Sequence, residues 1–181
     1  MDNSLHKNNK LHNDNRGYSL IELVIVLAII AIIMSTVFYS IILIFSANAK
    51  SCANNIQRSI GECKVTTMGK ADAYMELYRD DTGVYTRMHV TESDGTVTDE
   101  EPQKVGSNRV TVGYVQGGTE TELTPGASIE ICFDRSNGGF KAGAGGLYDE
   151  IYVRGGSKNY SITMTALTGK SEVVAKPMPS P

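Results

Sequence analysis

Glu22 is the residue of this sequence whose position most strongly suggests a chemical role. It stands at the start of an apolar run, because the 23 residues from Leu23 to Phe45 contain no charged residue, glycine or proline. An isolated carboxylate in apolar surroundings costs free energy unless it is paired. Glu22 therefore predicts either a cationic partner or a position at the headgroup level of a membrane, where it would be solvated and idle.

Few other residues are arranged for catalysis or metal binding. His89 lies in a predicted strand without a nucleophile from any recognisable motif, so we expect a residue on the strand surface and no enzyme. Cys52, Cys63 and Cys132 show no Cys-x-x-Cys spacing, so we expect neither zinc nor a cofactor. The sequence therefore favours a structural or binding protein.

The three cysteines cannot all pair within one chain. Cys52 and Cys63 are 11 residues apart, which on one helix is about 16 Å and beyond the reach of a disulfide. Cys132 could pair with either only if its strand packed beside the helix. Because side chains alternate along a strand, Cys132 lies on the face opposite Ile131 and Phe133, which argues against such a pair. We favour buried, unpaired thiols on the helix.

Two loops suggest ligands without the spacing that binding requires. Residues 136–146, "SNGGFKAGAGG", lack the following helix and the Lys-Ser/Thr ending of a phosphate loop, so we expect a mobile loop. The acidic residues near position 100 do not have EF-hand spacing, so a solvated acidic loop is favoured over a calcium site. These acids are Asp94, Asp99, Glu100 and Glu101.

The apolar run predicts a membrane-spanning helix. As a helix, its residues would extend about 35 Å, enough for a hydrocarbon core of roughly 30 Å. The polar residues 1–17 carry Lys7, Lys10 and Arg16, which places this end in the cytoplasm by the positive-inside rule. A buried core helix and an ordinary secretion signal cut after Ala49 are the alternatives, and the run is too long for either.

The helix is predicted to continue beyond the membrane as an amphipathic segment. Small and apolar residues recur there at intervals of three and four, which predicts one helix from residue 18 to about 68 with a stop near Gly69. These residues are Ala49, Cys52, Ala53, Ile56, Ile60 and Cys63.

From residue 71 the pattern changes to alternating apolar and polar positions separated by turns. About seven short strands are predicted, in residues 71–79, 84–91, 109–116, 128–135, 148–155, 160–167 and 168–176. One long helix followed by these strands predicts an α+β fold with a mainly antiparallel β head.

The junction "RGYSLIELVIVLAIIAII" at residues 16–33 resembles the start of type IV pilin and type II secretion pseudopilin precursors. The resemblance implies that a membrane-embedded prepilin peptidase cuts between Gly17 and Tyr18 and methylates the new amine of Tyr18. Tyr18 stands where the family usually has phenylalanine. It also implies that Glu22 meets the Tyr18 amine of a neighbouring subunit in a filament.

The resemblance implies a lollipop-shaped pilin fold in five parts. These parts are the leader 1–17, the assembly half of the helix 18–45, its amphipathic half 46–69, the head 70–176 and a flexible tail 177–181. The order of motifs in the head, from "CFDRSNGGF" onward, resembles that of the H-type minor pseudopilins. Many major pilins carry a proline in the middle of the membrane-spanning segment, and this chain has none there. Its filament contacts therefore need not match theirs.

The expected partners are other pilin or pseudopilin subunits, the peptidase, an inner-membrane assembly platform and, before assembly, membrane lipid. We expect a single pass through the cytoplasmic membrane with the head outside, at the cell surface or in the periplasm once assembled. A net charge of −3 gives no support for nucleic acid binding. The alternatives are an anchored extracytoplasmic binding module that never polymerises and a secreted domain released after Ala49.

Overall fold

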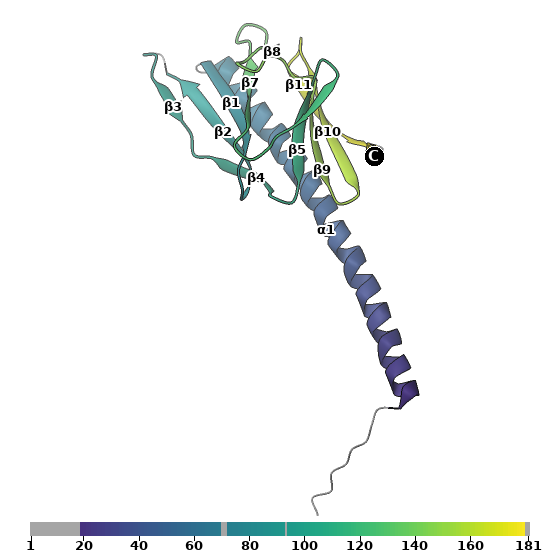
Figure 1. The fold of residues 1–181 in the computed structure, drawn as a ribbon. Helices are drawn as coiled ribbons and strands as arrows, with labels where there is room; N and C mark the ends of the chain where they lie inside the picture. Colours follow the sequence, from purple (N-terminus) through teal and green to yellow (C-terminus); the bar gives the residue numbers. More distant parts are fainter. Residues whose placement is uncertain (1–18, 70–71, 93, 180–181) are drawn as a thin grey trace, which may run out of the picture. The chain divides into compact units, whose positions relative to one another are not determined.

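A computed structural model describes residues 19–69, 72–92 and 94–179 of the chain (Figure 1). The chain divides into two compact units, Met1–Phe38 and Tyr39–Pro181. One unbroken helix, α1 (Leu20–Gly69, 50 residues), contributes to both units. The remaining regular elements are strands that belong to the second unit. The expected α+β class is therefore confirmed, and so is the long amino-terminal helix.

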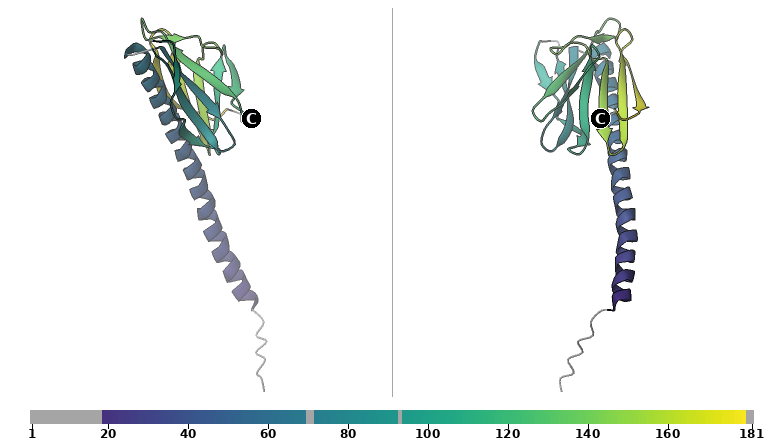
Figure 2. Two further views of the ribbon diagram at one scale, coloured as in Figure 1. Left: turned by 90° about the vertical axis from the view of Figure 1, so that its left-hand side faces the viewer. Right: turned by 45° about the vertical axis from the view of Figure 1, so that its right-hand side comes forward.

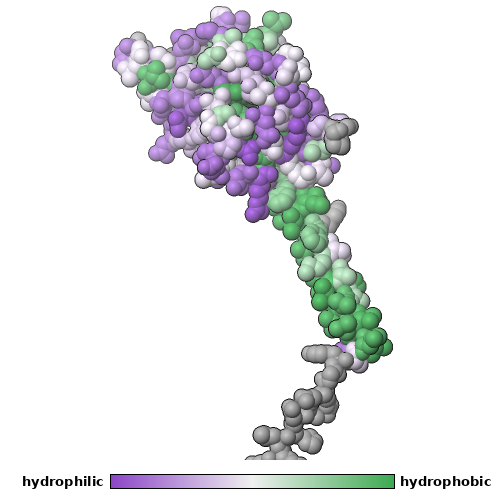
Figure 3. All heavy atoms as spheres, viewed as in Figure 1, coloured by the Kyte–Doolittle hydropathy of each residue, from purple (hydrophilic) through white to green (hydrophobic). Residues whose placement is uncertain are grey.

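The first unit, from residue 19 to 38 as described, is a helix that is apolar on every side. None of its described side chains is buried, and α1 is long and apolar enough there to cross a membrane. In Figure 3 its surface is almost uniformly hydrophobic. A helix that is apolar all round needs lipid or other helices around it, because it has no polar face for water.

The second unit contains two antiparallel sheets, drawn from further directions in Figure 2. The first sheet has the order β3-β2-β1-β7-β8, with β4 also paired to β2. Its strands are β1 (Asp72–Arg79), β2 (Gly83–Thr91), β3 (Val97–Asp99), β4 (Gln103–Ser107), β7 (Ser128–Phe133) and β8 (Phe140–Lys141). The second sheet has the order β11-β10-β9-β5-β6. Its strands are β5 (Thr111–Gln116), β6 (Thr119–Glu122), β9 (Glu150–Gly155), β10 (Lys158–Thr165) and β11 (Lys170–Lys176).

The amphipathic half of α1 supplies one wall of the hydrophobic core. The six residues of the predicted stripe are each at most 1% exposed, so this prediction is confirmed. They lie with inward-facing side chains of both sheets, including Leu77 and Ile131 from the first and Ile151 and Ile162 from the second. Residues at intervals of three and four share one helix face, which is why the pattern could be recognised.

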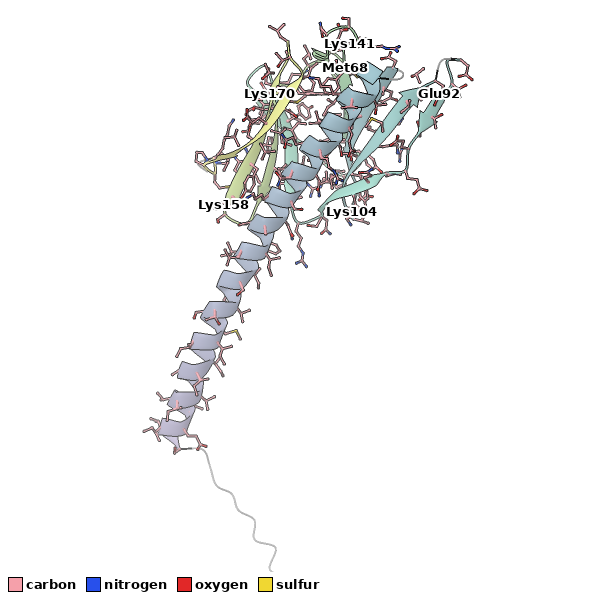
Figure 4. All side chains as sticks on the ribbon, turned by 180° about the vertical axis from the view of Figure 1, so that it is seen from behind. Met68, Glu92, Lys104, Lys141, Lys158 and Lys170 are labelled. Atoms are coloured by element: carbon pink, nitrogen blue, oxygen red, sulfur yellow. The ribbon has the colours of Figure 1, made fainter. Side chains whose placement is uncertain are left out.

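Polar contacts on either side of that stripe attach α1 to both sheets. The Ser59 hydroxyl lies 3.1 Å from that of Thr86 in β2, and both residues are buried. On the other side, the Gln57 amide donates to the carbonyl of Ser171 in β11 at 2.9 Å. Figure 4 shows α1 crossing the sheets, with Met68 at its end near Lys141 and with Lys104 and Lys158 at the opposite end of the sheets.

Four short strands were not predicted. The segment expected to be an acidic loop contains β3 and is followed by β4, and both strands pair with β2. The strand β6 follows Gly117 and Gly118 and pairs with β5. The glycine-rich segment contains β8, and Gly143 and Gly146 form an isolated bridge. These elements are short and carry no alternating apolar pattern, because their described side chains are mostly exposed.

All three cysteines are free, and those on the helix are buried. The Cys63 thiol lies 3.9 Å from the carbonyl oxygen of Ala73 and 3.8 Å from that of Ile131. Burial raises the pKa of Cys52 and of Cys63 to about 12. Cys132 is only partly buried, and burial followed by the nearby Glu130 carboxylate raises its pKa.

We expect the helix thiols to resist alkylation in the folded protein. At pH 8 iodoacetamide should modify Cys132 slowly and leave Cys52 and Cys63 unmodified, because a raised pKa leaves almost no thiolate. Mass spectrometry of peptides after timed labelling would measure this order. In urea the three rates should converge, and equal rates in the folded protein would contradict the burial described above.

Two glycines, one in α1 and one in β9, differ in how much space surrounds them. A Cβ on Gly61 would meet nothing within 4 Å, whereas one on Gly155 would lie 2.8 Å from the Phe45 carbonyl oxygen and 3.0 Å from the Ala49 Cβ. Gly155 therefore lets β9 approach the backbone of α1 closely.

Replacing these two glycines by alanine should have opposite effects on the stability of the head. Gly61→Ala should raise the free energy of unfolding by about 0.5–1 kcal/mol, because alanine is the better residue in an exposed helix interior. Gly155→Ala should lower it by about 1–3 kcal/mol through overpacking. Urea unfolding in detergent, followed by tyrosine near-UV circular dichroism, measures both, and a stable Gly155→Ala variant would contradict the close approach.

Candidate functional site at the start of the helix

The start of α1 is defined by two hydrogen bonds to Ser19. The backbone N–H of Glu22 donates to the Ser19 hydroxyl at 3.2 Å, and the N–H of Leu23 donates to the Ser19 carbonyl at 3.1 Å. These bonds make Ser19 the N-cap, since an N-cap side chain accepts from the third helical residue while its carbonyl accepts the first intrahelical bond. Ser19 therefore fixes the residue at which the helix begins.

Glu22 occupies the third position of the helix, where a carboxylate is favourable. The positive end of the helix dipole lies in this first turn and attracts anions. A glutamate three residues after a serine N-cap also completes the sequence of a capping box. Glu22 is exposed, so its carboxylate remains accessible to a partner from outside the helix.

Sequence reasoning identified Glu22 but did not recognise Ser19 as the cap of the helix. The signal was present, because Ser-x-x-Glu ahead of an apolar run is a typical helix start. The helix was predicted from residue 18 and begins at Leu20. Gly17 and Tyr18, the predicted cleavage and methylation positions, lie outside the described residues.

The apolar segment that follows satisfies its own polar groups. The Ser35 hydroxyl donates to the Ile32 carbonyl at 2.7 Å, and the Thr36 hydroxyl donates to the Ile33 carbonyl at 2.8 Å. Such internal bonding is required in a hydrocarbon environment, where no water can replace it. Ala28 and Ala31 are also exposed. Together with Ser35, they offer small residues at which another helix could approach closely.

His89 is the second candidate, and its predicted surface position was wrong. It is 8% exposed, and its Nδ1 lies 2.7 Å from an oxygen of Asp99 in β3. Its Nε2 is 3.5 Å from an oxygen of Glu76, and its ring stacks on Tyr74 at a centroid distance of 4.5 Å. Desolvation, together with the carboxylates of Glu130, Asp99 and Glu76, raises the pKa of Tyr74.

The contacts of His89 join three strands of the first sheet. His89 lies opposite Tyr74 of β1 and Asp99 of β3 in the strand register. Asp99, expected to lie in an acidic loop, is thus the strand residue that holds the imidazole. Through these contacts His89 links β2 to β1 and to β3.

The two loops considered for phosphate and calcium binding, and rejected on their spacing, have defined contacts in the structure. Among the described residues, no group of three or more His, Cys, Asp and Glu side chains could hold a metal ion. The glycine-rich segment is held in place by the Ala144 N–H, which donates to Glu130 at 3.1 Å, and by the Gln116 amide, which donates to the Gly145 carbonyl at 2.8 Å. These bonds attach the segment to β5 and β7, and its mobility stays a prediction.

Comparison with known proteins gives one match, and it falls on the start of the helix. No curated protein and no solved structure matches the chain. Residues 12–38 match the model of the prokaryotic N-terminal methylation motif. This range includes Gly17, Tyr18 and Glu22, together with the cap at Ser19. The chain thus carries a prepilin-type N-terminal methylation motif, and this motif supports a relationship to type IV pilins and pseudopilins.

Proposed function

We propose that this chain is the precursor of a structural subunit that is cut after Gly17, methylated at Tyr18 and assembled into a pilus-like filament. The observation that carries the proposal is the methylation motif, whose described part from Leu20 to Phe38 is a helix without a buried side chain. The filament would be a type IV pilus, a competence pilus or a type II secretion pseudopilus. A minor, H-type subunit is the finer assignment that we propose from the layout of the head.

Gly17 has the chemistry expected of the residue before the cut. Because it lacks a Cβ, the backbone at this position can approach an enzyme closely. Cleavage there removes the polar residues 1–17 and keeps the apolar helix on the mature chain. An ordinary secretion signal does the reverse, since its apolar segment leaves with the signal.

The exposed apolar helix supports assembly by helix packing. In lipid, helices associate through close van der Waals contact, which small residues at intervals of three or four permit. Ala28, Ala31 and Ser35 have this spacing and are all exposed. Residues 18–45 would first lie in the cytoplasmic membrane and then pack against other pilin or pseudopilin subunits. The prepilin peptidase and an inner-membrane assembly platform complete the proposed partners, with the amino terminus inside and residues 70–176 outside.

Glu22 would set the register of that packing. Its exposed carboxylate lies in the first turn of α1, close in sequence to the amine that cleavage creates at Tyr18. A Glu22 carboxylate paired with the Tyr18 amine of a neighbouring subunit satisfies two charges at once. A subunit docked one step out of register would leave both charges unpaired in apolar surroundings, which is strongly unfavourable.

Processing after Gly17 should be visible at the amino terminus of the protein in its host. Protein extracted from host membranes should begin at Tyr18 and carry one added methyl group, as measured by intact mass and amino-terminal sequencing. Replacing Gly17 by valine should block the cut and leave the chain in the membrane. A chain that begins at Met1 would indicate a static anchored binding module, and one that begins at Lys50 would indicate ordinary secretion.

Two substitutions separate the charge of Glu22 from its contribution to the helix start. Glu22→Leu and Glu22→Gln should both insert in the membrane and be cut normally, yet enter sheared filament fractions much less than the wild type. Glutamine keeps the size of the side chain and serves equally in a capping box, so its failure would identify the charge as the requirement.

Glu62→Gln is the matched control for the charge of Glu22. Glu62 lies on the exposed side of the same helix, and its carboxylate is 3.6 Å from Arg58. Removing an exposed charge pair of this kind should have little effect. Normal filament incorporation of Glu22→Gln would contradict the proposed pairing.

A further inference from the structure

We propose that four exposed cations of the head form a basic collar that binds the headgroups of anionic phospholipids. The basic collar consists of Lys50, Lys104, Arg109 and Lys158, which are all exposed. The proposal rests on the proposed function, because it concerns the subunit while residues 18–45 lie in the membrane. It adds the class of lipid that the subunit meets there and the residues that meet it.

The sequence of α1 puts the start of the head at the level of the lipid headgroups. The apolar run ends at Phe45, and Lys50 is the first charged residue after it. As a helix of about 35 Å, the run fills a hydrocarbon core of roughly 30 Å, and each headgroup layer adds about 5–7 Å. At about 1.5 Å per residue, that layer is level with residues 46–50 of the same helix.

Arg109 provides a contact at the boundary between hydrocarbon and headgroups. Its guanidinium carbon lies 5.4 Å from the centroid of the Phe45 ring. A guanidinium over an aromatic face keeps its N–H donors free at the edge. Those donors match the oxygens of a phosphate in pairs. Arg109 therefore presents a phosphate-binding group beside the last residue of the apolar run.

The turn between β9 and β10 lies against the same part of α1. The Ser157 N–H donates to the hydroxyl of Ser46 at 3.4 Å, and Ser46 is the first residue after the apolar run. Lys158 follows this turn directly, so it reaches the headgroup level. Figure 4 shows Lys104 and Lys158 at the same end of the sheets, opposite to Lys141.

The cations of the basic collar are available to a ligand. None of them forms an ion pair with a carboxylate in the described part of the chain, whereas Arg154 is paired with Glu120 at 2.8 Å. Lys104 donates to the carbonyl of Thr82 at 2.8 Å, which uses one of its three N–H donors. Its remaining donors are free for a phosphate oxygen.

A polar groove accompanies the basic collar at this level. It has a volume of about 260 Å³, and its lining includes Asn48 and Ser51 of α1 with Lys104 and Ser107 of β4. Amide and hydroxyl groups donate to phosphate oxygens. The groove therefore offers neutral donors next to the charged ones.

The turn between β1 and β2 brings two carboxylates, those of Asp80 and Asp81, near the basic collar. The Asn108 amide lies 3.5 Å from the Asp81 carbonyl oxygen and donates to it. The Asp80 carboxylate already accepts from the N–H groups of Thr82 and Gly83, at 2.7 and 2.8 Å. Two negative charges against four positive ones leave a surface that an anionic bilayer attracts.

The test measures the lipid preference of the full-length protein. The protein is purified from host membranes in detergent, and phosphatidylglycerol or phosphatidylcholine is added while native mass spectrometry counts the bound lipids. We expect phosphatidylglycerol to bind more tightly. Arg109→Gln and Lys158→Gln should each lower this preference about fivefold, because a cation near an anionic surface contributes about that factor.

Two further variants serve as controls. Lys141→Gln removes an exposed cation at the other end of the sheets, so it should leave the preference unchanged. Arg109→Lys keeps the charge and should keep most of the preference. Near-UV circular dichroism checks that each variant retains the folded head.

Amide hydrogen exchange in lipid nanodiscs locates the contact. Residues 107–110 and 155–158 should exchange more slowly when phosphatidylglycerol is added to phosphatidylcholine. High salt should remove this difference, because it screens exposed charges.

Each other result would overturn the proposal. Equal binding of the two lipids, or an undiminished preference in both Arg109→Gln and Lys158→Gln, would mean that the basic collar does not recognise anionic lipid. Equal protection by inorganic phosphate in phosphatidylcholine nanodiscs would mean that a free anion suffices. The amino terminus of the same preparation tests the proposed function separately, since a chain that begins at Met1 would contradict that function and leave the lipid preference measurable.

Discussion

The packing of one helix stripe into two sheets is the interaction on which the head of this protein depends. The stripe from Ala49 to Cys63 is almost completely buried, and side chains of both sheets complete the core around it. Small residues at Ala49, Cys52 and Ala53 let the strands come close to the helix axis. Without this wall, each sheet would expose an apolar face to water, which a domain of this size could not tolerate.

The same helix satisfies a different requirement at its other end. Apolar side chains cover every side of the described residues before Phe38, so no stripe exists there. The only acidic residue of that first turn is Glu22, placed where the helix dipole favours it and close to a serine cap. A single helix therefore combines a half suited to lipid or other helices with a half built into a core.

The sequence predicted the features that are periodic and missed those that depend on pairing across the fold. The helix and its stripe follow from regular spacing, and the longer strands follow from alternation. The strand β6, Thr119–Glu122, has no apolar residue at all, so only its pairing with β5 reveals it. His89 was placed on the surface because its partners, Asp99 and Glu76, come from strands whose register could not be read from the sequence. The cap at Ser19 was visible as a local pattern, whereas Gly17 and Tyr18 stay predictions.

The order of contacts along α1 has a consequence for how the chain acquires its structure. Ala49 lies against Gly155, Gln57 bonds Ser171, and Lys64 donates to the carbonyl of Thr168 at 2.7 Å. The amphipathic half of α1 is thus synthesised early, whereas the strands β9, β10 and β11 that pack against it are synthesised last. The core around the stripe is complete only when these carboxyl-terminal strands are in place, so the head cannot fold fully until nearly the whole chain has been synthesised. Truncation near the carboxyl terminus would then leave the stripe uncovered, a form that chaperones and proteases recognise by its exposed apolar surface.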